Sequence, residues 1–375
     1  MSTLLQFYDI FFKMVHMKVY ASMLKRLIIV ALVVVGLIAG DQLLGYMYFN
    51  KGGVVFWTSG EDYVLDRDLI YSGATQKHSQ NKSSEYTENV DTNSLGYRDH
   101  EIGKKDTKTY RIIAVGDSFT FGHGIESNSE TYPKKLETYL NLSGKKVEVF
   151  NVAVRGYSPD QEYRQIVKKL LILQPDMIIW NFSDPGDLYN STAHNGGWPT
   201  PSLYDVNGPR LIPLDARFNW VYMGKYVKKH VPPFIRNSNL LNLCIFYASQ
   251  THLFTRKPYF SEDALTRWAI QKLNLQVEDV KKITDKLKIN LIITVLPYPY
   301  KFSPTSSNSK VDIAFNAFFK SLEKKRFTVI DVKNSIVNMK IPPKDLFYKI
   351  DYHPNKLGTA FFAKIVGEAI LNTIR

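Results

Sequence analysis

This sequence has a single cysteine, and no group of its cysteine and histidine residues has the spacing of metal ligands. Cys244 is the single cysteine among 375 residues, so no disulfide can form within the chain, and cysteine usage does not report the redox compartment. The eight histidines are scattered, and none combines with cysteine at the spacing of a zinc site. We therefore expect no metal ion and no other cofactor.

Internal repeats, low-complexity tracts and nucleic-acid-binding motifs are also missing from the sequence. The charge is one-sided, with 48 Lys and Arg against 35 Asp and Glu and a formal net charge of +13. A basic surface attracts anionic partners such as lipid headgroups and acidic glycans, although solvated surface lysines are the simpler explanation. We expect no nucleic-acid partner.

Long apolar runs are scarce. One that is long enough to be a membrane span covers residues 27–49, with Asp41 as its single acid. As a helix this run would be about 34 Å long, enough to cross a bilayer core. Its aromatic end fits a membrane interface, and basic residues outnumber acids before it. The positive-inside rule then leaves the N-terminus in the cytoplasm and the bulk of the chain on the other side of the membrane.

Two alternatives to a transmembrane anchor stay open. A cleaved signal peptide would have a shorter apolar core and a small-residue cleavage site, which Ala39-Gly40-Asp41 matches poorly. A buried core helix is the other alternative, and Asp41 favours it slightly. Under the anchor interpretation, residues 1–26 are a cytoplasmic segment, 27–49 cross the bilayer, 50–110 are a mixed linker and entry segment, and 111–375 are the main domain.

From residue 111 onward, short apolar runs alternate with amphipathic stretches. The runs are rich in β-branched and aromatic residues and predict buried parallel strands, over residues 111–116, 147–152, 177–181, 290–296 and 327–332. The amphipathic stretches predict helices over residues 132–140, 159–173, 265–287 and 356–373. Such alternation is typical of a doubly wound, flavodoxin-like α/β sandwich of three layers, with a parallel sheet of about five strands.

Residues 190–250 interrupt this alternation. They are rich in Tyr, Trp and Phe and contain Asp205-Val-Asn-Gly208, a probable hairpin turn. We interpret them as an insertion over the edge of the site, either a lid or a substrate platform. A structural excursion without contact to a ligand is the alternative.

The stretch Gly116-Asp-Ser-Phe-Thr-Phe-Gly-His-Gly124 follows the first predicted strand and precedes a helix. A serine at such a turn is well placed to act as a nucleophile, because the strand fixes the backbone and the helix offers unpaired N–H groups. A second motif, Asp351-Tyr-His353-Pro-Asn, lies near the C-terminus. Serine, histidine and aspartate are the parts of a catalytic triad. His123 also follows the serine closely, but it has no obvious orienting acid.

With these pieces in order, the chain resembles the SGNH/GDSL hydrolase superfamily, and within it the single-span, membrane-anchored bacterial members. The resemblance covers residues 90–375. It rests on Asn93-Ser-Leu-Gly-Tyr-Arg98, residues 116–122, Asn151-Val-Ala-Val-Arg-Gly156, the stretch after Trp180, and residues 351–355. It implies a domain at the bacterial inner membrane that faces the periplasm.

The resemblance implies that Ser118 is the nucleophile, that His353 is its general base, and that Asp351 orients the imidazole. It further implies an oxyanion hole made of the backbone N–H groups of Ser118 and Gly156 and a side-chain amide from a Gly-x-Asn-Asp block. That block departs from the pattern here, because Gly186 or Ser183 stands where the asparagine should be. Asn181 or Ser183 is the candidate for the third donor.

We therefore expect a membrane-anchored serine esterase that cleaves O-acyl esters, O-acetyl groups on a cell-envelope glycan above all. An acyltransferase using the same triad is a close alternative. A glycan-binding or assembly protein with little catalysis is a third possibility, suggested by the missing asparagine. The expected partners are the bilayer, through residues 27–49, and the acylated substrate.

Overall fold

The computed structural model describes residues 23–43, 62–66, 68–83, 85–184, 262–302, 310–339 and 342–374, together with Pro232. Most of the expected cytoplasmic segment and, apart from Pro232, the whole expected insertion at 190–250 lie outside these ranges. Gly186, from the incomplete Gly-x-Asn-Asp block, lies outside them as well.

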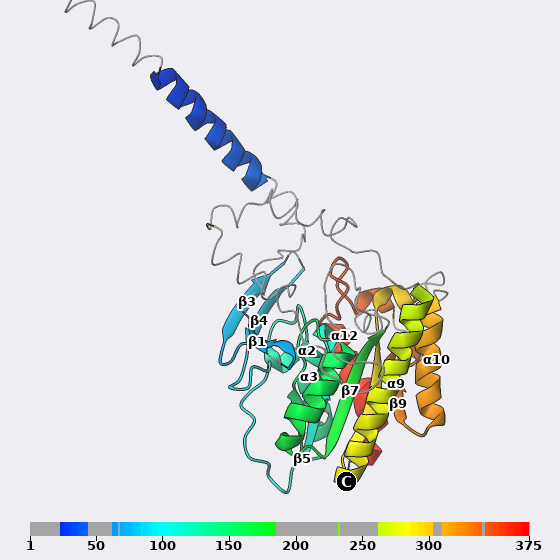
Figure 1. Ribbon diagram of the computed structural model, residues 1–375. Coiled ribbons are helices and arrows are strands. Elements are labelled where there is room, and N and C mark those ends of the chain that lie inside the picture. Colours follow the sequence, from blue (N-terminus) through cyan, green and yellow to red (C-terminus); the bar gives the residue numbers. More distant parts are fainter. Residues whose placement is uncertain are drawn as a thin grey trace, which may run out of the picture.

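The apolar run near the N-terminus is helical over Met23–Leu43 (Figure 1, blue). This helix has a mean hydropathy of 2.3 over its most apolar window, and none of that window is buried against the rest of the protein. A buried core helix is thereby disfavoured. By length and composition the helix is able to cross a membrane, and a signal sequence has the same properties.

The centre of the main domain is a parallel sheet of five strands in the order β6-β5-β7-β8-β9. This is the flavodoxin-like order, in which the first two strands in sequence are exchanged in space. The strand positions confirm the sequence prediction to within a few residues. The strands are β5 (Tyr110–Val115), β6 (Val147–Asn151), β7 (Met177–Asp184), β8 (Asn290–Pro297) and β9 (Thr328–Asp331).

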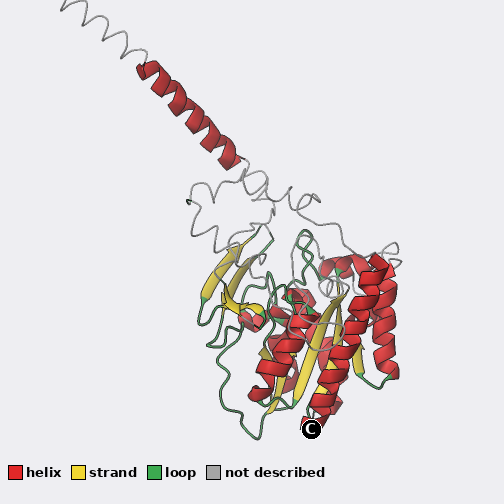
Figure 2. Cartoon of the chain, in the orientation of Figure 1, coloured by secondary structure: helices red, strands yellow, loops and turns green. Residues whose placement is uncertain are grey.

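Helices cover both faces of this sheet (Figure 2), so successive residues of a strand enter different cores. In β5, Ile112 and Ala114 pack on one side and Ile113 and Val115 on the other. The first side holds α3 (Tyr132–Leu142), α11 (Val332–Asn338) and α12 (Lys356–Ile370). The second holds α4 (Pro159–Gln165), α9 (Glu262–Leu287) and α10 (Lys310–Lys324). Burial on both faces explains the continuous apolar strand sequences.

The structure differs from the sequence prediction in the stretch expected to be a linker. Two antiparallel hairpins lie there, β1 (Tyr63–Asp66) with β2 (Ile70–Gly73), and β3 (His78–Lys82) with β4 (Thr87–Asp91). In Figure 1, β3 and β4 lie on the opposite side of the domain from α10. The sequence of β3, His-Ser-Gln-Asn-Lys, has no apolar residue. Its strand comes from backbone pairing with β4, which hydrophobic periodicity cannot reveal.

Candidate active site

Ser118 is the first residue of the short helix α2 (Ser118–Phe121), directly after β5 and the turn Gly116-Asp117. Asp117 caps the helix by accepting a hydrogen bond from the Phe119 N–H at 2.9 Å. Gly116 allows the tight turn, because a Cβ there would lie 2.4 Å from the Thr120 hydroxyl oxygen. The nucleophile candidate therefore stands at the carboxyl end of a central strand, where ligands bind in doubly wound folds.

The structure brings Ser118, His353 and Asp351 together across 235 residues of sequence. His353 Nε2 lies 2.8 Å from Ser118 Oγ, and His353 Nδ1 lies 2.5 Å from Asp351 Oδ1. Because a carboxylate can only accept, the proton of the neutral imidazole belongs on Nδ1, which leaves Nε2 to accept the serine proton. This is the geometry that general-base activation of a serine requires.

Asp351 lies in a pocket of hydrogen-bond donors. Burial opposes its charge, but hydrogen bonds and charge interactions with His123 and His353 outweigh that effect and hold the pKa of Asp351 well below its ordinary value. Tyr86 OH adds a third donor, at 3.1 Å from Asp351 Oδ2. The Asp351 carboxylate is therefore charged at neutral pH.

His123 is part of this cluster, and the expectation that it has no orienting acid is wrong. Its Nε2 lies 3.5 Å from Asp351 Oδ2 and 2.9 Å from Tyr86 OH. Its ring is 4.6 Å from that of His353, centroid to centroid. Burial lowers the pKa of His123 despite its contact with Asp351. His123 thus shares the acid with His353, while Ser118 bonds to His353.

Gly156 takes the left-handed backbone conformation that favours glycine, with φ at +72°. The loop that carries it continues the pairing of β5 and β6, because the Val154 N–H donates to the Gly116 carbonyl at 3.2 Å. This loop therefore runs alongside the turn before Ser118. Backbone N–H groups from the Ser118 and Gly156 turns are the candidate donors to an oxyanion.

The two candidates for a third oxyanion donor already bond elsewhere. Asn181 is buried, donates from its side-chain amide to the carbonyls of Val115 at 2.7 Å and Ile179 at 3.4 Å, and accepts from the Thr294 hydroxyl at 2.5 Å. The Ser183 hydroxyl donates to Asp117 Oδ2 at 2.7 Å. Both side chains fasten β7 to its neighbours in the described structure, so either would have to break these bonds to reach a substrate.

Behind the nucleophile lie two buried carboxyl groups. Burial raises the pKa of Asp117, and it raises that of Glu162 well above the ordinary value, to which the neighbouring Asp117 contributes further. Glu162 Oε2 accepts a hydrogen bond from Trp180 Nε1 at 2.8 Å. Neither carboxyl group touches Ser118 Oγ or His353 through a hydrogen bond in the described residues. Asp117 thus supports the turn through its bond to the Phe119 N–H, and Glu162 bonds to Trp180 of β7.

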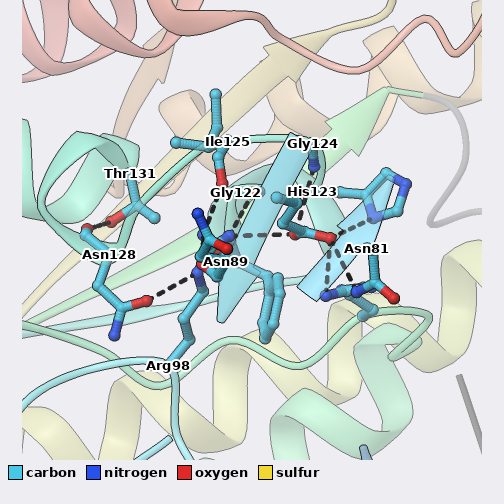
Figure 3. A network of polar contacts seen from close by, with 12 residues as sticks. Asn81, Asn89, Arg98, Gly122, His123, Gly124, Ile125, Asn128 and Thr131 are labelled. Atoms are coloured by element: carbon cyan, nitrogen blue, oxygen red, sulfur yellow. Dashed lines mark hydrogen bonds and ion pairs between the residues drawn. The ribbon is translucent and has the colours of Figure 1, made fainter. Parts of the chain in front are cut away.

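A buried ion network lies beside the cluster (Figure 3). Arg98 is fully buried and donates to the carbonyls of Gly122 at 2.5 Å and Ile125 at 2.7 Å, while its guanidinium lies 3.2 Å from Glu88. Arg155 pairs with the same carboxylate at 3.1 Å. Arg98 therefore docks the loop after α2 rather than facing a substrate. Sequence reasoning missed Tyr86 and Glu88, which lie in the hairpin that had no strand signal.

His123, Asp351 and His353 also offer potential metal-ligand atoms that all lie within 4.8 Å of one another. An ion bound by all three would occupy a ring nitrogen of His353, and both ring nitrogens are used, one toward Ser118 and one toward Asp351. Metal binding by this set and base catalysis by His353 would therefore compete for the same lone pair.

No protein-family model matches the chain, and no curated protein is significantly similar to it. Several solved structures are similar. A GDSL-like lipase from Bacteroides thetaiotaomicron has 11% identity over 72% of this chain and 92% of its own, with a TM-score of 0.39. A variant of the acetyl-xylooligosaccharide esterase Axe2 from Geobacillus stearothermophilus has 12% identity over 70% and 94%, with a TM-score of 0.41.

A family 3 carbohydrate esterase from Clostridium thermocellum has 15% identity over 72% of this chain and 98% of its own, with a TM-score of 0.39. At these identities and scores the likenesses carry no argument about activity, which has to come from the geometry of the site. The similar structures named here are thus a lipase described as GDSL-like and two esterases.

Proposed function

We propose that this chain is a serine ester hydrolase with Ser118 as nucleophile, His353 as general base and Asp351 as the orienting acid. One observation carries the proposal: a continuous hydrogen-bonded line from Ser118 Oγ through the His353 ring to Asp351, with contacts of 2.8 and 2.5 Å. Ser118 and the Asp351–His353 pair come from distant parts of the sequence and meet in the order and at the distances that acyl transfer needs.

The reaction follows from the roles of the three groups. As Ser118 Oγ attacks the ester carbonyl, its proton moves to His353 Nε2, and Asp351 stabilises the resulting imidazolium through Nδ1–H. The backbone N–H groups of Ser118 and Gly156 stabilise the tetrahedral oxyanion by hydrogen bonds. The imidazolium then gives its proton to the departing alkoxide, which leaves as the alcohol, and an acyl-Ser118 remains. Water attacks this acyl group, again with His353 as base, and releases the acid.

For the substrate, we propose an O-acyl ester on a cell-envelope glycan, with O-acetyl first. Support comes from the apolar helix Met23–Leu43, which is able to hold the domain at a membrane, and from the basic residues before it. With a sugar hydroxyl in place of water, the same acyl-Ser118 would give acyl transfer.

A binding or assembly role with little catalysis is the second candidate. The engaged side chains of Asn181 and Ser183 favour it, because the loss of one oxyanion donor typically slows turnover by about 100- to 1,000-fold.

The test is active-site labelling of the full-length chain, purified in detergent, with a fluorophosphonate probe. We expect labelling at Ser118 that is lost in Ser118→Ala, which removes the hydroxyl, and in His353→Ala, which removes the base that activates it. Ser143→Ala is the matched control, because in the described part of the chain the Ser143 hydroxyl donates to the Tyr139 carbonyl alone, at the end of α3. A folded wild type that is not labelled would contradict the hydrolase proposal and favour the binding role.

A further inference from the structure

The turn of the β3–β4 hairpin reaches across to the loop that carries the acid and base of the triad. Glu85, in this turn, accepts hydrogen bonds from three successive backbone N–H groups, those of Lys349 at 2.7 Å, Ile350 at 3.0 Å and Asp351 at 2.9 Å. A carboxylate that accepts from several backbone N–H groups makes strong, charge-assisted hydrogen bonds. The hairpin thereby fixes the backbone of the acid itself.

That loop needs such support, because its backbone is strained. Tyr352, between the acid and the base, has φ at +66°, in the left-handed region that a bulky residue rarely adopts. Strain of this kind persists only where surrounding contacts over-determine it. Besides Glu85, the loop is held by the Tyr348 N–H, which donates to the His353 carbonyl at 2.9 Å.

The next residue of the hairpin turn, Tyr86, contacts the acid directly. Its hydroxyl donates to Asp351 Oδ2 at 3.1 Å, while the His353 ring uses Oδ1. Burial, together with the charge of Asp351, raises the pKa of Tyr86, so the hydroxyl stays protonated and remains a donor. Its ring packs 5.0 Å from that of Tyr348.

Strand β4 of the hairpin is anchored to the nucleophile side of the site. Glu88 of β4 is fully buried between Arg98 and Arg155, and its Oε1 lies 3.3 Å from the Gly124 N–H. Arg98 in turn bonds the carbonyls of the loop after α2 (Figure 3). The hairpin therefore touches both sides of the site, the Ser118 side through Glu88 and the acid–base side through its turn.

We propose that Glu85 and Tyr86 are positioning residues of the active site, which hold Asp351 so that only Oδ1 faces His353. This inference rests on the proposed function. Among the described residues neither side chain contacts Ser118, and both act through Asp351 and its loop. The β3–β4 hairpin then contributes to catalysis, although it lies outside the central five-stranded sheet.

The experiment uses the full-length chain in detergent, with p-nitrophenyl acetate as the ester and the fluorophosphonate probe as a second readout. We expect Tyr86→Phe to lower kcat by about 10- to 100-fold, to leave KM within about twofold, and to slow the labelling of Ser118 by a similar factor to kcat. The matched control is Tyr110→Phe. Tyr110 also bonds through its hydroxyl, to Asn290 at 2.7 Å, but at the opposite ends of the strands.

Glu85→Gln provides an independent variant. It keeps one acceptor oxygen but loses the charge, and we expect kcat to fall about tenfold with KM unchanged. Glu101→Gln is its control, since Glu101 likewise accepts from a backbone N–H, that of Ser94 at 2.8 Å, far from Asp351 in the sequence and in a different loop.

The outcomes separate this inference from the proposed function. If wild type is labelled and both hairpin variants keep wild-type kcat and labelling rates, the positioning role is wrong and the hydrolase proposal stands. Variants that change KM alone also contradict positioning. If folded wild type is neither labelled nor active, the proposed function fails and this inference fails with it. A purely structural role would lower the yield of folded protein while leaving kcat per labelled site unchanged.

Discussion

The two sides of the candidate site are built in different ways. Ser118 follows a central strand, and its turn is fixed by the buried Gly116 and Asp117 and by backbone bonds that continue the sheet. His353 and Asp351 lie on a half-buried loop with a left-handed residue between them, held by the turn of a peripheral hairpin. The nucleophile is thus part of the core, whereas the acid and base depend on an accessory element.

We expect the two sides of the site to respond differently to substitution. Substitutions on the nucleophile side should lower stability and activity together, because the turn is inseparable from the packed sheet. Substitutions on the acid–base side that leave the charge of Asp351 in place should lower activity while the free energy of unfolding changes little.

The largest effect is expected for Asp351→Asn. The amide cannot stabilise the imidazolium in the same way and favours the wrong tautomer of His353, so kcat should fall by about 10,000-fold. Steady-state hydrolysis of p-nitrophenyl acetate measures this, with circular dichroism to verify the fold. A loss of less than about tenfold would mean that Asp351 is not the orienting acid.

The same variant has a pH signature in stability. The pKa of Asp351 is lowered in the folded protein, so its charged form contributes stability that is present above the unfolded value of about 3.9 and is lost as the pH falls toward the folded value. The difference in unfolding free energy between wild type and Asp351→Asn should therefore shift against wild type on acidification from pH 6 to 3. Chemical denaturation at several pH values checks this, and a constant difference would contradict it.

An intermediate effect is expected for Gly116→Ala, on the nucleophile side. The new Cβ would lie 2.4 Å from the Thr120 hydroxyl oxygen and 2.9 Å from Thr120 Cβ, inside a packed turn. We expect a loss of about 1 to 3 kcal/mol in the free energy of unfolding, together with lower activity. Gly103→Ala is the control, because nothing lies within 4 Å of a Cβ there. Reduced activity at unchanged stability would break the comparison between the two sides.

The smallest effect is expected for Glu162→Gln, behind the nucleophile. Burial raises the pKa of Glu162, so its contribution to stability is complete below the unfolded value of about 4.5 and is lost as the pH rises toward the folded value. Glutamine does not ionise and can still accept from Trp180 Nε1. The variant should gain stability relative to wild type at pH 8 and little at pH 4. A melting-temperature difference between the variant and wild type that is equal at both pH values would contradict a raised pKa of Glu162 in the folded protein.

The sequence by itself determined the central sheet and the order of the three candidate catalytic residues. Strands buried on both faces have continuous apolar sequences, so their positions follow from composition alone. A serine after the first strand and a histidine–aspartate pair before the last helix then have to meet near the carboxyl edge of the sheet.

Only the tertiary structure decided the rest. The β3–β4 hairpin is polar and half-exposed, and Tyr86 reaches Asp351 across 265 residues of sequence, a distance over which local periodicity carries no information. The same holds for three other features. His123 contacts Asp351, the side chains of Asn181 and Ser183 bond within the protein, and Arg98 binds the loop after α2. Each depends on which groups lie next to each other in the folded chain. Such pairings are set by the packing of separate elements, and a pattern within one element does not contain them.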